Sequence, residues 1–186
     1  MCRCIDQHFP CQNHNYSDFD KIAEAELLNP TPASDIVNNS QYCNPVPADE
    51  LHKIGDLTAS LFLKPLAGKI GVYHMWSEYE YCDEHKSYTM QCEYVGKGPP
   101  GARITSHIKK KWQNEKLLHV TFYECENRLA KYYEQLFLDK YQFELNKSEN
   151  NGTETLYAIW TEERFRLGTH SNEISSLSKM NSPDDW

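Results

Sequence analysis

Two apolar runs in the middle of the chain constrain its fold more than any other feature. Gly71-Val72-Tyr73 opens the first run, and Tyr94-Val95-Gly96-Lys97 closes the second. Both runs have the residue pattern of β-strands, and the segment between them is polar and charged. Consecutive strands of this kind pair as an antiparallel hairpin, so the sequence predicts that the two glycine-containing motifs lie close together.

The expected hairpin has strands over residues 69–77 and 87–95, joined by a long loop over residues 78–86. Alternation in the returning strand predicts one shared face for four side chains: Tyr88, Met90, Cys92 and Tyr94. A turn rich in glycine and proline covers residues 96–101, and a helix is expected from Ala102 to Asn114. The inward-facing side chains of this helix are Ile104, Ile108 and Trp112.

A third strand over residues 117–123 and a long helix over residues 126–143 complete a β–β–α–β–α order. This order predicts an α+β fold in which a small three-stranded antiparallel sheet is flanked by helices. We expect an N-terminal helical extension over residues 1–68 and the core over residues 69–146. A C-terminal hairpin and a mobile tail are expected over residues 147–186.

The two flanks are less regular. The N-terminal extension contains expected helices over residues 16–28 and 48–63. Residues 29–47 between them are rich in Pro, Asn and Ser, which predicts a loop. Near the other end, residues 156–160 have strand character, and residues 163–167 are their expected partner.

Charge and hydropathy exclude some classes of protein. The net charge of −8 over 186 residues argues against a protein that coats nucleic acid without specificity, although it allows a local basic face. No segment approaches the roughly 20 apolar residues of a membrane-spanning helix. The first residues also lack the apolar core of a signal peptide. The expectation is a soluble, cytoplasmic protein with no membrane partner.

The chain has seven cysteines, an odd number, and they are more scattered than in a secreted disulfide framework. Reduced thiols are therefore expected. Three short spacings hint at zinc: Cys2-x-Cys4, Cys11-x-x-His14 and Cys82-x-x-His85. A closed four-ligand spacing is missing from the sequence, so zinc binding by the N-terminal Cys/His cluster stays open.

Glu134 is difficult to explain by packing alone. Its neighbours at helical spacing are apolar: Ala130, Phe137, Leu138 and Tyr141. A buried carboxylate without a partner is costly, so Glu134 needs a cation, a metal or a strong donor. A structural salt bridge to Lys131, or to a residue across the sheet, is the alternative, and the spacing does not separate the two.

Arg103 and His107 lie one turn apart, so both project from one face of their helix. Lys97 precedes them, and a run of three lysines follows at residues 109–111. A planar guanidinium near a turn rich in backbone N–H groups suits a phosphate. A solvated helix face is the other interpretation, and it explains the lysines better than the Arg–His pair.

Tyr73 and Tyr94 lie on the two paired strands, each close to a motif glycine. Taken alone, two tyrosines on a sheet are more often core rings than catalytic hydroxyls.

In combination these residues resemble the GIY-YIG nuclease superfamily, which includes intron homing endonucleases, the incision subunit of bacterial nucleotide-excision repair and some type II restriction enzymes. Gly71-Val72-Tyr73 and Tyr94-Val95-Gly96-Lys97 are similar to its paired tripeptides. The family's helix arginine, the following histidine or tyrosine, the metal-binding glutamate and the asparagine fall at Arg103, His107, Glu134 and Asn146. The resemblance covers residues 71–146. The interval between the motif tyrosines is longer than usual, which implies an insertion at residues 77–87.

The resemblance implies a divalent-metal-dependent endonuclease that hydrolyses phosphodiester bonds in DNA. Glu134 would hold one Mg²⁺ (or Mn²⁺) ion, and the metal and Arg103 would stabilise charge in the transition state. DNA rather than RNA as the substrate rests on family analogy.

The remaining motif residues have implied roles around the attacking water. Tyr73 would be the general base or would orient the water, with Lys97 lowering its pKa. Tyr94 and His107 would position the phosphate or the water, and Asn146 would orient the site from behind.

A stand-alone sequence- or structure-specific enzyme is the favoured class, and a homodimer would allow double-strand cleavage of a palindrome. Three alternatives stay open. A nucleic-acid-binding module would keep the fold without cleavage, although the intact Tyr, Tyr, Arg and Glu set argues against it. A toxin or effector nuclease would use the same site. An unrelated interaction protein would bind a partner through N-terminal acids: Asp18, Asp20, Glu24, Glu26, Asp49 and Glu50.

Overall fold

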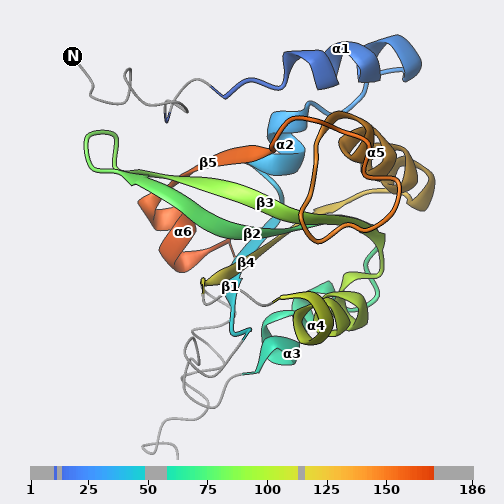
Figure 1. Cartoon of the computed structure of the whole chain (residues 1–186). Coiled ribbons are helices and arrows are strands. Elements are labelled where there is room, and N and C mark those ends of the chain that lie inside the picture. The colour runs from blue at the N-terminus through green and yellow to red at the C-terminus, as the bar shows by residue number, and fades with distance from the viewer. Residues whose placement is uncertain (1–10, 12–13, 49–57, 113–115, 170–186) are drawn as a thin grey trace, which may run out of the picture.

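Five antiparallel strands form one curled sheet, a half-barrel, in the computed structural model of the chain (Figure 1). The structure describes residues 11, 14–48, 58–112 and 116–169. The strands are β1 (Tyr42–Val46), β2 (Gly71–Cys82), β3 (Ser87–Gly98), β4 (Leu118–Glu124) and β5 (Tyr157–Thr161). They lie in the order β1-β4-β2-β3-β5, and each neighbouring pair is antiparallel.

Helices cover both faces of the sheet (Figure 1). The helices α1 (Ser17–Glu26), α2 (Ala33–Val37) and α5 (Asn127–Lys140) lie over one face. The other face carries α3 (Ala59–Phe62), the 3₁₀ turn η2 (Lys64–Leu66) and α4 (Pro100–Lys111). The short helix α6 (Glu162–Leu167) packs against the two outer strands, β1 and β5. The expected α+β class is confirmed.

Each face of the sheet has its own core. On one face Phe19 of α1 packs on Phe137 of α5 with ring centroids 4.4 Å apart. The opposite core buries the three residues that the sequence places inward on the helix after the hairpin, namely Ile104, Ile108 and Trp112. The apolar side predicted for the long helix is buried as well: Ala130, Phe137, Leu138 and Tyr141. Each large side chain that is fully buried contributes on the order of 1.5–3 kcal/mol to folding.

The sheet has more strands than the three expected. Residues 29–47, expected as a loop, contain α2 and β1, and β1 pairs with β4 from Tyr42 opposite Phe122 to Val46 opposite Leu118. The Pro45 in this segment favours a loop by composition, but proline is tolerated on an edge strand. A carboxylate oxygen of Asp20 accepts a hydrogen bond from the backbone N–H of Ala33 at 2.7 Å, so α1 supplies a partner for the first residue of α2.

The hairpin is longer and its turn is shorter than expected. Residues 78–86 were expected to form a loop, but β2 continues to Cys82 and β3 begins at Ser87, which leaves a turn of residues 83–86. The polar residues of this stretch alternate with Tyr79 and Tyr81, a pattern that a strand with one solvated face also produces. Residues 78–82 of this segment therefore extend β2, and β5 pairs with the beginning of β3, from Ser87 to Gln91.

The C-terminal flank is partly as expected. Residues 157–161 form β5, but residues 163–167, the expected partner strand, belong to α6. The side chain of Thr161 accepts a hydrogen bond from the backbone N–H of Arg164 at 3.2 Å, and two acids follow in the first turn, so local capping favours a helix here.

The expected helix over residues 48–63 lies largely outside the described residues, and its last part is α3. The expected tail lies outside them from residue 170 onward.

Two histidines lie in the core. Neither ring nitrogen of His74 has a hydrogen-bond partner within the described residues, and its ring packs against those of Trp76 and Phe137, at centroid distances of 5.4 and 4.9 Å. Burial lowers the pKa of His74 to about 3, and it lowers the pKa of His119 to about 4. Both folded pKa values lie below the value of about 6.5 for an unfolded histidine. Between each folded pKa and pH 6.5 the unfolded chain therefore binds more protons than the folded protein.

We expect the free energy of unfolding to fall as pH drops below about 6.5, with each buried histidine adding up to about 1.4 kcal/mol per pH unit to the slope. The variant His74→Phe keeps an aromatic ring and removes one titrating group, so it should show a shallower slope. Urea unfolding at pH 7 and pH 5 measures this, and both proteins should show the same pH dependence between pH 7 and 8. An equal pH dependence of the unfolding free energy in His74→Phe and the wild type would contradict the lowered pKa of His74.

Candidate active site

A β-bulge in β3 determines where Tyr94 points. Met75 pairs with Tyr94 and Trp76 pairs with Cys92, so Glu93 is an extra residue on β3. One extra residue reverses the alternation of side chains beyond it. Cys92 accordingly belongs to the core under α5, whereas Tyr94 packs with the core under α4. The expectation that Tyr94 shares a face with Cys92 is therefore wrong.

The bulge places the two motif tyrosines on the same face. Their rings stack at a centroid distance of 6.1 Å with 27° between the planes. Tyr73 is opposite Gly96 in the hairpin, and a Cβ atom on Gly96 would lie 2.5 Å from the Tyr73 hydroxyl oxygen. A Cβ atom on Gly71 would lie 2.0 Å from the carbonyl oxygen of Tyr123. Both motif glycines are thus required by close approach of other groups.

Glu134 forms a salt bridge with Lys97, from α5 to the end of β3. The Glu134 side chain is only 15% exposed, and that of Lys97 is 32% exposed. The sequence suggested a cation, a metal or a strong donor for Glu134, with a structural salt bridge to Lys131 or to a residue across the sheet as the alternative. The partner in the structure is Lys97 rather than Lys131. The ion pair offsets the cost of placing the carboxylate beside the apolar side of α5.

Arg103 is attached to the turn that follows β3. Its Nη1 donates a hydrogen bond to the carbonyl oxygen of Lys97. Gly98 lies between them with φ +90, a conformation that favours glycine. Arg103 is exposed, so the other N–H groups of its guanidinium can donate to an oxygen ligand.

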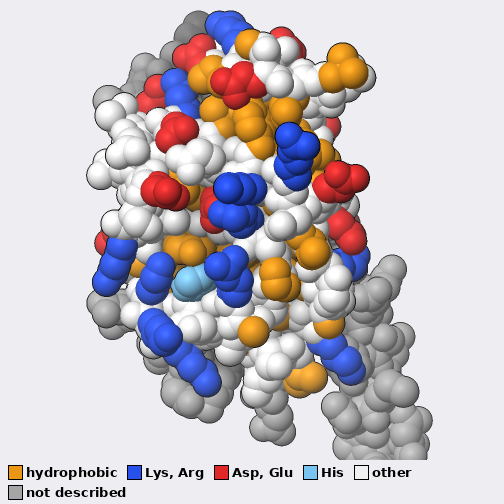
Figure 2. All heavy atoms as spheres, turned by 90° about the vertical axis from the view of Figure 1, so that its right-hand side faces the viewer, with side chains coloured by type: hydrophobic (Ala, Val, Ile, Leu, Met, Phe, Trp, Pro, Cys, Tyr) orange, Lys and Arg blue, Asp and Glu red, His pale blue; other side chains and the backbone are white. Residues whose placement is uncertain are grey.

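His107 and Lys111 both contact the ring of Tyr94. The His107 ring lies 4.4 Å from it between centroids, and the Lys111 Nζ lies 4.5 Å from the Tyr94 centroid. Burial, together with repulsion from Lys111, Arg103 and Lys110, lowers the pKa of His107 to about 4. His107 is therefore neutral at pH 7. Figure 2 shows basic side chains gathered around a histidine on this side of the molecule.

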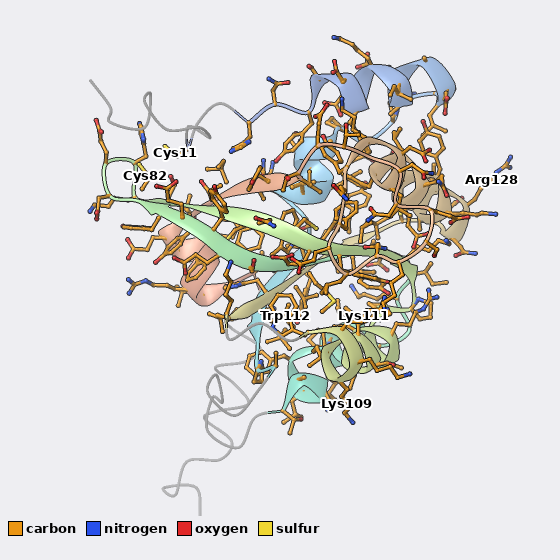
Figure 3. All side chains as sticks on the ribbon, in the orientation of Figure 1. Cys11, Cys82, Lys109, Lys111, Trp112 and Arg128 are labelled. Carbon is orange, nitrogen blue, oxygen red and sulfur yellow. The ribbon has the colours of Figure 1, made fainter. Side chains whose placement is uncertain are left out.

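Lys111 is a functional candidate that sequence reasoning missed, because the lysines at residues 109–111 resemble a solvated helix face. Its ammonium also donates a hydrogen bond to the carbonyl oxygen of Leu145, at 3.1 Å. Lys111 therefore joins α4, the Tyr94 ring and the segment after α5. The labelled Lys109, Lys111 and Trp112 in Figure 3 lie along α4.

Asn146 binds the backbone of β3 between the two motif residues Tyr94 and Gly96. Its amide oxygen accepts from the N–H of Val95 at 3.1 Å, and its amide nitrogen donates to the carbonyl of Val95 at 3.0 Å. The preceding residue, Leu145, donates its N–H to the carbonyl of Glu93 at 2.9 Å. The segment after α5 thus completes the hydrogen bonding of β3 around the bulge, which is a positioning role.

Both tyrosine hydroxyls are neutral in this arrangement. Burial raises the pKa of Tyr73, and the nearby phenol of Tyr94 adds to the effect, while Arg103 opposes it. Burial also raises the pKa of Tyr94. We expected Lys97 to lower the pKa of Tyr73, but the Lys97 ammonium is paired with Glu134 and the pKa of Tyr73 shifts in the other direction.

The structure brings all the sequence-predicted site residues to one end of the hairpin: Tyr73, Tyr94, Lys97, Arg103, His107, Glu134 and Asn146. A groove of about 830 Å³ lies beside them between α3 and α4, with Lys64 and Lys109 in its lining. None of the seven lines this groove, so it is a neighbouring surface rather than the centre of the candidate site.

No protein-family model, curated protein or solved structure matches this chain. Within the described part of the chain, none of the helices has both the length and the apolar run that crossing a bilayer requires.

We expect Gly96→Ala to displace the Tyr73 ring, because the new methyl group would overlap its hydroxyl. Overpacking of this kind costs about 1–3 kcal/mol. The matched control is Gly101→Ala on α4, where a Cβ atom meets nothing within 4 Å. Thermal unfolding of both variants measures the difference. Equal stability of Gly96→Ala and the wild type would contradict the close approach.

Proposed function

We propose that this protein is a divalent-metal-dependent endonuclease of the GIY-YIG type that hydrolyses phosphodiester bonds in DNA. The observation that carries the proposal is the convergence of one carboxylate, one exposed guanidinium and two stacked tyrosines at the glycine-rich end of the hairpin. A plain core would not need a carboxylate as little exposed as Glu134, and a plain solvated helix would not place Arg103 and His107 beside the tyrosine pair.

The residues at this end suit a magnesium ion. Mg²⁺ is commonly held by one or two carboxylates, with waters and substrate phosphate oxygens completing its shell. Glu134 offers one carboxylate, and the Lys97 ammonium beside it marks a position that favours a cation. Bound there, the metal would neutralise charge on the scissile phosphate.

The chain's own groups bind and orient the substrate. The Arg103 guanidinium offers donors to the phosphate, and its attachment to the Lys97 carbonyl holds it in place. His107 has a free lone pair at pH 7, because its pKa is about 4, so it can accept a hydrogen bond or a proton from water. Tyr73, with a raised pKa, donates a hydrogen bond and orients water rather than removing its proton.

The basic surface of α4 supplies the contact with the DNA backbone. Lys109, Lys110 and Lys111 end this helix, and Arg103 lies on it about two turns earlier. The acidic side chains responsible for the net charge of −8 lie outside α4. Some of them pair with lysines, as Asp18 does with Lys140 at 3.3 Å. This arrangement favours binding through one face rather than general coating of nucleic acid.

The test is cleavage of supercoiled plasmid DNA by the purified full chain, with Mg²⁺ or with EDTA. We expect Glu134→Gln, which keeps the shape and removes the charge, to lower the rate by at least about 10²-fold. Asp139→Asn is the matched control, because Asp139 is an exposed carboxylate on the same helix that accepts a hydrogen bond from Gln135.

Binding of the same DNA is measured in parallel by fluorescence anisotropy. Cleavage lost in Glu134→Gln with binding retained supports the proposal. Unchanged cleavage in that variant would remove Glu134 from the mechanism. DNA binding by the wild type without cleavage would favour the alternative of a binding module that kept the fold.

A further inference from the structure

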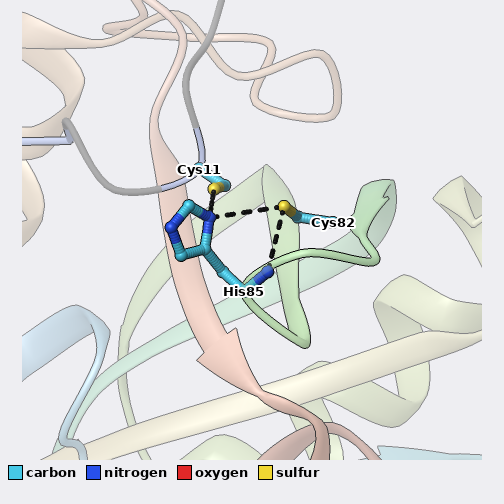
Figure 4. Close-up of side chains that lie close together, drawn as sticks. All are labelled: Cys11, Cys82 and His85. Carbon is cyan, nitrogen blue, oxygen red and sulfur yellow. Dashed lines mark hydrogen bonds between the residues drawn. The ribbon is translucent and has the colours of Figure 1, made fainter. Parts of the chain in front are cut away.

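Three metal-ligating side chains meet at the opposite end of the hairpin from the candidate active site (Figure 4). They are Cys11, Cys82 and His85, and their ligand atoms all lie within 4.8 Å of one another. Cys82 ends β2 and His85 lies in the turn, whereas Cys11 comes from a segment more than seventy residues earlier, as its separation of 74 from His85 shows. A local turn sequence therefore does not explain the meeting.

The spacing of the three atoms is close to that of a tetrahedral metal site. The His85 Nδ1 is 2.9 Å from the Cys11 sulfur and 3.5 Å from the Cys82 sulfur. Ligands bound to zinc at its usual bond lengths lie roughly 3.5–3.8 Å apart, so small side-chain shifts would admit the ion. Both cysteine residues are buried, and thiolate and imidazole are the ligands that zinc prefers.

The backbone of the turn also favours a metal-bound thiolate. The N–H of His85 points at the Cys82 sulfur at 3.4 Å, and such a donor stabilises negative charge on sulfur. The Cys82-x-x-His85 spacing brings both side chains to one side of the turn, as Figure 4 shows. A pair of thiols that merely filled space would not need the imidazole between them.

We propose that Cys11, Cys82 and His85 bind a structural zinc ion that fastens the N-terminal segment to the tip of the extended hairpin. Tetrahedral zinc takes four ligands, so one ligand beyond these three completes the site. Cys82 is nine residues beyond Tyr73 along β2, which is roughly 30 Å of strand. Figure 3 likewise shows Cys11 and Cys82 at the far end of the sheet from the labelled residues of α4. The zinc is therefore separate from the metal that Glu134 would hold.

The test is the metal content of the full chain, purified under reducing conditions without chelator. Elemental analysis should find about one zinc per chain in the wild type, as a closed structural site requires. Cys82→Ser and His85→Ala should each lose most of it. The matched control is Cys125→Ser, because Cys125 is a partly exposed cysteine outside the cluster. Glu134→Gln should also retain zinc, so failure of the nuclease proposal would not affect this result.

Cobalt substitution tests the ligands in the wild-type protein, so the result does not depend on whether the variants fold. Wild-type protein refilled with Co²⁺ should show the visible bands of tetrahedral cobalt together with thiolate-to-metal charge transfer, and Cys125→Ser should show the same spectrum. Chelation should lower the melting temperature of the wild type and leave that of His85→Ala unchanged. A wild type without zinc, a Cys11–Cys82 disulfide found by mass spectrometry under non-reducing conditions, or zinc retained in His85→Ala would overturn the proposal.

Discussion

The close approach of the Tyr73 ring to Gly96 is the contact on which the candidate site depends. It requires a residue without a side chain on β3, and it requires Tyr94 to face the same way as Tyr73. The bulge at Glu93 meets the second requirement by reversing the alternation of β3. A bulge leaves backbone groups unpaired, and these are satisfied by Leu145 and Asn146 from the segment after α5. The bulge thus accounts for the contacts of Asn146 with the backbone of β3.

The extended hairpin links two sites with different requirements. One end carries the close backbone approach, the ion pair and the basic helix. The other end carries a short turn in which two sulfurs and an imidazole converge. Between them, β5 pairs with β3 from Ser87 to Gln91, and β4 pairs with β2 from Gly71 to Trp76. The segment over residues 78–86 thus extends β2 to Cys82 and positions the cysteine–histidine turn, and β5 pairs with the part of β3 that follows this turn.

Sequence reasoning predicted which residues of the candidate site lie close together better than it predicted the strands of the sheet. A helix has a fixed period, so the spacing in the sequence places Arg103 and His107 on one face. The same spacing identifies the apolar neighbours of Glu134. Strand alternation placed Tyr94 on the wrong face, because one bulged residue reverses the alternation of the side chains beyond it. Such a bulge cannot be recognised from the amino-acid composition of the strand. Proline in β1 and charges in the hairpin resembled loop signals, although an edge strand and a solvated strand tolerate them. Contacts between distant segments, such as Cys11 with His85, have no period to detect.

The Lys97–Glu134 pair connects folding to the proposed chemistry. A carboxylate that is only 15% exposed needs a counter-charge in the folded state, and Lys97 provides one from the strand end that also holds Arg103 by its carbonyl. A divalent cation offers the same carboxylate twice the charge of an ammonium, so it competes directly with Lys97 for Glu134. Lys97 is 32% exposed and has a flexible four-carbon stem, so it can turn toward a phosphate oxygen when displaced. The ion pair that stabilises the fold without substrate would then become two separate contacts with the metal and the phosphate.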